Sequence, residues 1–396
     1  MRDESAALTE ARAAAAADAA FGADMYQLLA EDAPDAVFSP ASVASALRMA
    51  LAGARGQTAA ELARALHLDG SPPEDVAASG LYLASAWRDG RSGGGPGGSA
   101  IFRAPNTVWV QSGLPLRAGF TGRLSHAAAT SGDADFAAAP EAARAEINRV
   151  IAEQTEGKIT GLLPPGAITA LTRLVLASAV YLKAAWADPF PDRATADAPF
   201  YPDGPGRPGL AVPTMRGPAS RAYLRGAGYQ AVLLPYQDIG LAMAVLLPDG
   251  PLAALRPKVA AAGLGGLLAG TSRHQVTLSM PRFRLEAAFD LIPALRRLGV
   301  AEAFGDHADF GGITEAEPLQ IGAVAHKAYV DVDERGTEAA AATAVVMRTL
   351  AAMRPPPAVT MLVDRPFLFA IVDTVTSLPV FLGQVSRPGS GRSGAS

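Results

Sequence analysis

The stretch that decides this fold runs from Glu334 to Pro357 and reads ERGTEAAAATAVVMRTLAAMRPPP. Its alanine run, Ala339–Ala342, has the highest helix propensity available, whereas the residues that follow, as far as Val346, favour a strand. Three prolines make the end of the stretch stiff and extended. The sequence therefore predicts a segment that is settled neither as a helix nor as a strand.

Alternate side chains of this stretch differ in character. One set is uncharged and suits a core: Thr337, Ala339, Ala341, Thr343, Val345 and Met347. The other set holds both charges: Glu338, Ala340, Ala342, Ala344, Val346 and Arg348. As a strand, the segment would bury one face and leave the other in water, and its small side chains would let it insert between existing strands. The alternative is a low-complexity, alanine-rich surface loop.

The composition limits what the chain can be. Its 396 residues are 49% hydrophobic, which is enough for a large core. The net charge is -4 and no basic run is present, which argues against a nucleic-acid partner. Cysteine is absent, so disulfides, a thiol nucleophile and thiolate metal sites are excluded. No apolar run approaches the ~18 residues of a membrane span, and the first residues lack the apolar core of a signal peptide.

Helical patterns dominate the first part of the chain and strand patterns the rest, which favours an α+β fold. We predict helices at 8–30, from Pro40 with Ser39 as its N-cap, and at 58–68, 81–87, 140–155 and 289–298. We predict strands at 106–111, 173–182, 230–236, 241–247, 276–280, 282–286, 328–332, 359–363, 367–373 and 379–385. Residues 183–190 should lead away from a strand, and 199–219 should be a loop. Residues 91–99 (RSGGGPGGS) are expected to be a flexible insertion.

Catalytic and cofactor motifs are missing from the sequence. It contains no GxxxxGK[ST], HExxH or GxSxG pattern, and none of its five histidines has metal-ligand spacing with another. We therefore expect no metal, no cofactor and no enzymatic activity. His326, which precedes a strand pattern, is expected to be a hydrogen-bonded structural residue. The alternative is a hydrolase that uses Ser39 or His326, for which the sequence offers no paired nucleophile and base.

Short motifs spread over roughly residues 15–388 resemble those of the serpin family and follow the family's order. They are FSPASV at 38–43, NTVWVQ at 106–111, TEGKI at 155–159, LVLASAVYLKAAW at 174–186, PRF at 281–283, HKA at 326–328, ERGTEA at 334–339, DRPF at 364–367 and FLG at 381–383. The resemblance implies one domain over residues 1–388, with three β-sheets and eight to nine helices. It also implies an exposed reactive-centre loop at about 334–357 and a disordered tail at 389–396.

A serpin is expected to inhibit a serine protease as a suicide substrate. The protease would cleave the loop, which would insert into the central sheet and trap the protease as an acyl-enzyme. The family's hinge falls on Glu334, Arg335, Gly336, Thr337, Glu338, Ala339, Ala340, Ala341 and Ala342. Family spacing places the reactive bond at Leu350–Ala351, with Arg348–Thr349 as the runner-up. Leucine implies a chymotrypsin-, subtilisin- or elastase-like target, and arginine a trypsin-like one.

The resemblance also implies residues that control the opening of the sheet: Ser39, Ser42, Ser178, Trp186 and His326. Ser178 stands where the family usually has asparagine, which puts the metastability of the fold in question. A non-inhibitory serpin, acting as a binding or chaperone-like module, is the alternative function, although the small hinge residues favour inhibition. We expect a monomer with a hazard of loop–sheet polymerisation and no membrane partner. The family suggests an extracellular location, and the missing signal peptide makes the cytoplasm the alternative.

Overall fold

The computed structural model describes residues 4–31, 33–68, 100–126, 130–338 and 358–389. Within these ranges the chain forms seven α-helices and two hydrogen-bonded β-sheets. The helices are α1 (Glu4–Leu29), α2 (Pro40–Leu51), α3 (Gly56–Ala65), α5 (Ala118–His126), α6 (Pro140–Gln154), α7 (Arg256–Leu268) and α8 (Ile292–Arg297). Helices and strands are mixed without the regular alternation of a parallel α/β fold, so the α+β class is confirmed.

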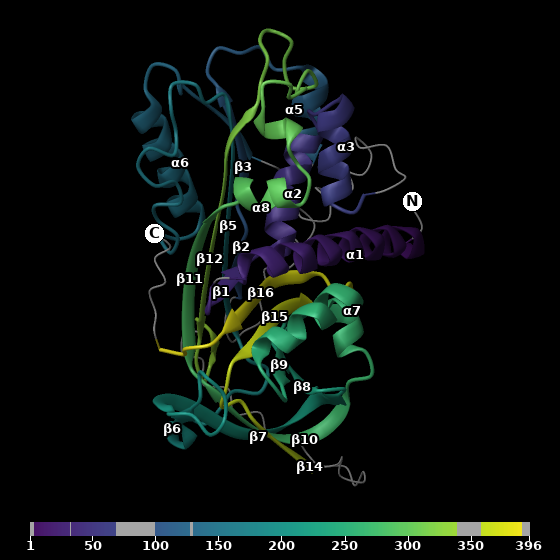
Figure 1. The fold of residues 1–396 in the computed structure, drawn as a ribbon, viewed down its shortest axis with the longest axis vertical. Helices are drawn as coiled ribbons and strands as arrows, with labels where there is room; N and C mark the ends of the chain where they lie inside the picture. Colours follow the sequence, from purple (N-terminus) through teal and green to yellow (C-terminus); the bar gives the residue numbers. More distant parts are fainter. Residues whose placement is uncertain (1–3, 32, 69–99, 127–129, 339–357, 390–396) are drawn as a thin grey trace.

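The seven-stranded sheet runs along the length of the molecule (Figure 1). Its strands, in spatial order, are β11 (Phe283–Asp290), β12 (Ile321–Val332), β13 (Gly336–Thr337), β5 (Leu174–Ala185), β3 (Asn106–Gln111) and β4 (Thr130–Ala134), with β2 (Ile101–Arg103) also paired to β5. The long strands β5 and β12 are buried along nearly their whole length. Such continuous apolar runs are typical of strands that are covered on both faces.

Helix α6 covers one face of this sheet and α2 the other (Figure 1). Ile147 and Ile151, one helical turn apart on α6, share an apolar cluster with Ala177 and Tyr181 of β5. On the opposite face, Val180 and Leu182 of the same strand belong to a second cluster, with side chains of the other sheet. The alternation of β5 side chains therefore separates the α6 side of the sheet from the main core.

The nine-stranded sheet contains β1 (Ala36–Phe38), β16 (Pro379–Val385), β15 (Phe367–Asp373), β9 (Leu241–Pro248), β8 (Tyr229–Pro235), β7 (Leu210–Gly226), β10 (Ser272–Pro281) and β14 (Ala358–Leu362), with β6 (Ala196–Phe200) on β7. The long strand β7 joins two parts of it, because residues 210–223 pair with β6 and β10 whereas 222–226 pair with β8. Counted as two parts, this sheet and the seven-stranded one correspond to the three expected sheets.

Several boundaries differ from the sequence prediction. Residues 199–219 are not a loop, because most of them belong to β6 and β7. Prolines had suggested the loop, but between residues 215 and 221 strand β7 has a partner on one side only, where a residue without an N–H is tolerated. Strand β5 continues to Ala185 instead of ending at 182, since β13 pairs with its last residues. The last predicted helix begins at Ile292, because Phe289 and Asp290 complete β11.

Two helices were not predicted, α5 and α7. The glycines of α7 lowered its apparent helix propensity, and one of them, Gly263, does interrupt the helix with a φ of 62°. The predicted helix at 81–87, the glycine-rich insertion at 91–99 and the tail beyond Gly389 lie outside the described residues.

Candidate functional site

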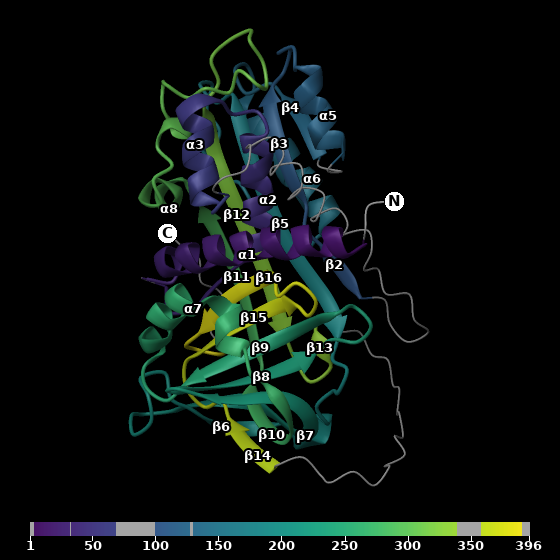
Figure 2. The ribbon, with the colours of Figure 1, turned by 90° about the vertical axis from the view of Figure 1, so that its right-hand side faces the viewer.

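The predicted hinge begins with Glu334–Glu338, the part of it that the structure describes, and this part lies at one end of the paired strands β5 and β12. Within it, Thr337 of β13 pairs with Ala184 of β5 and with Val332 of β12. Farther along, β5 and β12 pair with each other directly and in parallel, and we call this line of contact the seam. Figure 2 shows β13 at the end of the long strands that is remote from α5. The hinge therefore lies between β5 and β12, next to the point where their direct pairing begins.

Gly336 and Thr337 fit beside the ends of β5 and β12 for different reasons. A Cβ atom on Gly336 would lie 2.0 Å from the carbonyl oxygen of Ala184, so a larger residue would push β13 away from β5. The side chain of Thr337 is fully buried, and its hydroxyl lies 2.6 Å from that of Tyr236. Burial raises the pKa of Tyr236, so this phenol stays protonated. Small and partnered side chains thus let the hinge enter the sheet.

Trp186 holds the hinge from the end of β5. Its indole Nε1 donates to the carbonyl oxygen of Asp333 at 2.9 Å, and its backbone N–H donates to that of Arg335 at 2.8 Å. The indole stacks on Tyr236, with ring centroids 4.5 Å apart. Trp186 therefore acts at the hinge end of the seam and is not part of the polar network described below.

Glu334 anchors the first residue of the hinge through its buried carboxylate. Oε1 accepts from Arg282 Nε at 2.8 Å and from the hydroxyl of Thr195. The carbonyl oxygen of Glu334 accepts from the backbone N–H of Phe190 at 2.9 Å. Burial acts to raise the pKa of Glu334, but the hydrogen bonds from Arg282 and Thr195 outweigh it and hold that pKa below its usual value. The charged form of Glu334 is the one that fits the site.

The described part of the hinge ends at Glu338, whose carboxylate forms an ion pair with Lys158. The remaining hinge residues, Ala339, Ala340, Ala341 and Ala342, lie outside the described residues. So do both candidate reactive bonds, Leu350–Ala351 and Arg348–Thr349. These assignments stay predictions.

A buried polar network crosses the seam near its middle. His326 of β12 lies opposite Ser178 of β5, and the Ser178 hydroxyl is 3.1 Å from Nδ1 of the imidazole. Nε2 of the same ring accepts the backbone N–H of Ser39 at 3.0 Å. The hydroxyl of Ser39 in turn accepts the backbone N–H of Ser42 at 3.1 Å and so caps α2, as predicted. Four of the five residues assigned to sheet opening are thus brought together.

Asn106 belongs to this network and was missed as a functional residue. It is the first residue of β3, where it lies opposite Ser178, and its Oδ1 accepts from the Ser42 hydroxyl at 3.1 Å. The available signal was a polar asparagine, preceded by a proline, at the start of an otherwise apolar strand. The segment was interpreted only as a strand, so the side chain of Asn106 was not considered further. The network therefore spans β3, β5, β12 and the beginning of α2.

The hydrogen bonds of His326 define its protonation. Because Nε2 accepts a backbone N–H, it carries no proton, so a neutral ring has its proton on Nδ1 and donates to Ser178. The ring is fully buried, and burial lowers the pKa of His326 to about 3. His326 is therefore neutral at ordinary pH and ties the two strands to α2.

The same geometry speaks against a hydrolase built on Ser39 or His326. The bond between these residues uses the backbone N–H of Ser39, so the Ser39 hydroxyl is not aligned with the imidazole. The Ser178 hydroxyl does meet the ring, but that side chain is buried and receives its hydrogen bond as an acceptor. Neither arrangement provides an accessible, activated nucleophile.

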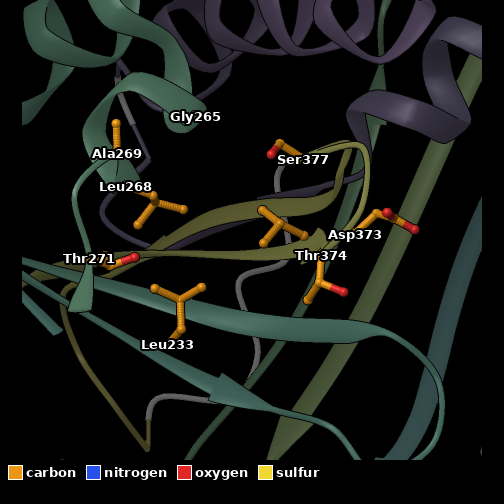
Figure 3. Close-up of a pocket in the computed structure, with 9 residues that line it drawn as sticks. Leu233, Gly265, Leu268, Ala269, Thr271, Asp373, Thr374 and Ser377 are labelled. Atoms are coloured by element: carbon orange, nitrogen blue, oxygen red, sulfur yellow. The ribbon is translucent and has the colours of Figure 1, made fainter. Parts of the chain in front are cut away.

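Other features of the described residues lie away from the seam. A pocket of about 270 Å³ opens between α7, β8 and the end of β15 (Figure 3). Its acidic residue, Asp373, is committed to the adjoining turn, where Oδ1 accepts the backbone N–H groups of Val375 and Thr376 at 2.8 Å. Among the described residues, no three acidic or histidine side chains are placed to hold a metal ion. No described helix is both long and apolar enough to cross a membrane.

Comparison with known proteins identifies the family. The pattern of the family described as Serpin (serine protease inhibitor) matches residues 16–388. The chain belongs to the serpin family. An uncharacterized serpin-like protein of Thermococcus kodakarensis is 35% identical over 378 residues, which cover 94% of this chain and 85% of that protein. The leukocyte elastase inhibitor of Sus scrofa is 35% identical over 384 residues, covering 94% of this chain and 99% of the inhibitor.

Solved structures agree with the family and the fold. The structure of Serpin48 from the insect Tenebrio molitor superposes with a TM-score of 0.81 at 27% identity, covering 98% of this chain and 99% of that one. Membership of the family supports protease inhibition, as opposed to catalysis, as the general activity of this serpin. The hinge, the seam and the polar network described above are the parts of the structure on which that activity can be argued.

Proposed function

We propose that this serpin inhibits a serine protease as a suicide substrate, by inserting its cleaved loop between β5 and β12. The protease serine attacks the carbonyl carbon of Leu350, the bond from that carbon to the nitrogen of Ala351 breaks, and the new amine takes the proton that the serine loses. The loop from Thr337 onward then enters the seam as a strand, with the acyl-enzyme attached at Leu350.

The register of β13 is the observation that carries the proposal. Thr337 pairs with Ala184 on β5, and an antiparallel strand continued from there would bring Met347 opposite Leu174. Ten positions separate Thr337 from Met347, and ten separate Ala184 from Leu174, which is the first residue of β5. The seam thus has the length of the segment whose alternation predicts a strand. Leu350, three residues farther, would emerge just beyond it.

The faces of the seam match the alternation of the loop. Ala184, Leu182 and Val180 of β5 face the main core, whereas Tyr181, Ala179 and Ala177 face α6. Directly paired residues on antiparallel strands share a face. Continued insertion would therefore send the uncharged set toward the main core: Thr337, Ala339, Ala341, Thr343, Val345 and Met347. Glu338 and Arg348 would fall on the side of α6.

The energy of insertion is sufficient to distort a bound protease. Each ladder hydrogen bond contributes a net ~0.5–1.5 kcal/mol. Over the segment from Thr337 to Met347, with the burial of Val345 and Met347 added, the total is on the order of 10 kcal/mol. That is comparable to the stability of a typical domain, ~5–15 kcal/mol. The sixteen residues that follow Glu334 as far as Leu350 reach roughly 55 Å when extended, enough to carry a protease along the sheet.

Leu350 favours a chymotrypsin-, subtilisin- or elastase-like target, and the similarity to leukocyte elastase inhibitors supports an elastase-like one. A trypsin-like protease, using Arg348, is the less favoured partner. We propose that the inhibitor acts as a monomer with a hazard of loop–sheet polymerisation, since a loop that can insert between β5 and β12 of its own molecule could also pair with these strands in another molecule.

The test is incubation of the protein with chymotrypsin, subtilisin, elastase and trypsin in turn. We expect an SDS-stable complex of one protease per inhibitor, and mass spectrometry of the released C-terminal fragment should give Ala351 as its first residue. A fragment starting at Thr349 would show that the reactive bond is Arg348–Thr349 instead. Cleavage in the loop without any covalent complex would refute suicide inhibition and favour a non-inhibitory binding role.

A further inference from the structure

Glu338 is the residue at which the chain turns out of the seam. Its backbone N–H donates to the carbonyl oxygen of Asp331 at 2.8 Å, so it still makes the bond of a strand paired with β12. Its φ, however, is 46°, in the left-handed region that a residue with a side chain rarely adopts. For the strand to continue past Glu338, this φ must become negative and the direction of the side chain must change.

The conformation of Glu338 coincides with its ion pair to Lys158. That lysine lies in the turn that follows α6, and the two residues after it fix the turn to the sheet. Ile159 is fully buried in the cluster beneath α6, and the carbonyl oxygen of Thr160 accepts Lys327 Nζ of β12 at 2.8 Å. Burial, followed by the negative charge of Glu338, raises the pKa of Tyr181 next to the pair. The cation is thus presented by a rigid part of the structure.

A different cation stands at the place that Glu338 would reach. Continuing the register from Thr337 and Ala184 by one position sets Glu338 opposite Lys183 of β5. Lys183 is half-buried, and it takes part in none of the ion pairs found among the described residues, whereas Lys158 and Lys327 both do. Lys158 therefore holds Glu338 in its turned conformation, whereas Lys183 would receive the same carboxylate in an extended strand.

We propose that Lys158 is a positioning residue that holds the hinge outside the seam, and that insertion transfers Glu338 from Lys158 to Lys183. The proposal rests on the loop-insertion function proposed above. It assigns the two lysines opposite effects. Lys158 stabilises the state before insertion and Lys183 the state after its first step.

The experiment compares Lys158→Met, Lys183→Met and, as the matched control, Lys258→Met on α7. The rate of SDS-stable complex formation is measured at saturating chymotrypsin. Because a partly exposed ion pair contributes up to ~1 kcal/mol, we expect Lys158→Met to speed insertion about two- to fivefold and Lys183→Met to slow it by a similar factor. The control should match the wild type. An unchanged or slower rate for Lys158→Met, or an unchanged rate for Lys183→Met, would overturn the proposal.

A second measurement on the uncleaved protein separates this proposal from the function on which it rests. Hydrogen exchange of the peptide that contains the Glu338 amide should become about two- to fivefold faster in Lys158→Met and stay as in the wild type in Lys258→Met. If no protease forms a covalent complex, suicide inhibition fails, but faster exchange still supports the restraint by Lys158. Exchange that does not change on loss of Lys158 shows that the lysine does not restrain the hinge.

Discussion

The hydroxyl of Ser178 on β5 lies 3.1 Å from Nδ1 of His326 on β12, so a side-chain hydrogen bond joins the two strands in addition to their backbone pairing. The other ring nitrogen of His326 accepts the backbone N–H of Ser39 at the beginning of α2. One neutral imidazole thus connects both sides of the seam to the helix behind it. A strand that enters the seam has to break the contact between Ser178 and His326.

Ser178→Ala should lower the stability of the uncleaved protein. The substitution leaves the Nδ1–H group of His326 buried without its acceptor, which costs about 1–3 kcal/mol. Urea denaturation monitored by circular dichroism measures the loss. Ser125→Ala, at an exposed position of α5, is the control and should change little. Equal stability of the two variants would show that the Ser178 hydroxyl does not support the seam.

His326 should make stability depend on pH. Its pKa is about 3 in the folded protein and about 6.5 when unfolded, so only the unfolded chain binds a proton between these values. The contribution of this residue is complete above pH 6.5 and is lost as the pH falls toward 3, by up to about 1.4 kcal/mol per pH unit.

Unfolding free energies of the wild type, His326→Gln and His274→Gln, measured from pH 7 to pH 4, test this dependence. Loss of His326 should flatten the profile, although the variant is less stable at neutral pH. The matched loss of the half-buried His274, on β10 and away from the seam, should leave most of the slope in place. Parallel profiles for the wild type and His326→Gln would rule out His326 as the source of the slope.

The sequence predicted most of the fold because its strands are strongly patterned. The limits of β3 and β15 agree with the structure, and Ser39 caps α2 as its position before a proline suggested. The errors in strand limits arose where the local residue types suggest a loop or a strand end, whereas pairing with a neighbouring strand keeps the segment extended. The prolines of β7 occur where that strand has one neighbour, and the last two residues of β5 are strand only because β13 lies against them.

The site was less accessible to sequence reasoning because it depends on register. The family motifs predicted that Ser39, Ser42, Ser178 and His326 act together, and the structure does place them in one network. It does not follow from any motif that Asn106 completes the network, or that Trp186 lies at the hinge, eight residues from Ser178 and just beyond the end of β5. These positions depend on the register between neighbouring strands. The register is known only once the pairing of the whole sheet is known.

Arg282→Met should release the beginning of the hinge. It removes the cation from the carboxylate of Glu334, which is 3% exposed. Leaving a nearly buried charge without its partner lowers stability by roughly 2–5 kcal/mol. We expect a loss at the lower end of this range, because Thr195 still donates to Glu334 and Arg282 is half exposed. Thermal unfolding should show a lower midpoint, and native gel electrophoresis after mild heating should show more polymer than for the wild type.

The double variant Arg282→Met/Glu334→Gln provides the control for this pair. Removing the charge of Glu334 as well should recover part of the stability, so that the two effects are not additive. If the losses of the single variants simply add, the ion pair does not hold the hinge.

Thr337→Arg should convert the inhibitor into a substrate. Thr337 is fully buried between β5 and β12, and its hydroxyl contacts Tyr236, so an arginine cannot occupy the position without leaving a charge in the core. Chymotrypsin should then cleave the loop and be released in active form. Thr337→Ser keeps the hydroxyl and should still form the SDS-stable complex. A complex formed equally well by Thr337→Arg would contradict insertion through this position.

Thr343→Val tests the middle of the inserted strand. From the pair of Thr337 with Ala184, a continuous strand reaches Ser178 after six positions, at Thr343, and the pair of Thr337 with Val332 leads after six positions to His326. An inserted Thr343 would therefore separate Ser178 from His326, and its hydroxyl could replace the hydrogen bond that insertion breaks. Valine has nearly the same shape and lacks this hydroxyl.

The cleaved and uncleaved forms should respond differently to this substitution. In the cleaved form, Thr343→Val should lower the unfolding free energy by about 1–3 kcal/mol, because the Nδ1–H group of His326 loses its new acceptor. In the uncleaved form, Ser178 still fills that role, so stability should be close to that of the wild type. Guanidinium denaturation of the uncleaved protein, and of the protein cleaved in its loop by a metalloprotease, which forms no acyl-enzyme, measures the difference. A loss confined to the uncleaved form, or equal in both, would mean that the loop does not enter the seam in the register set by β13.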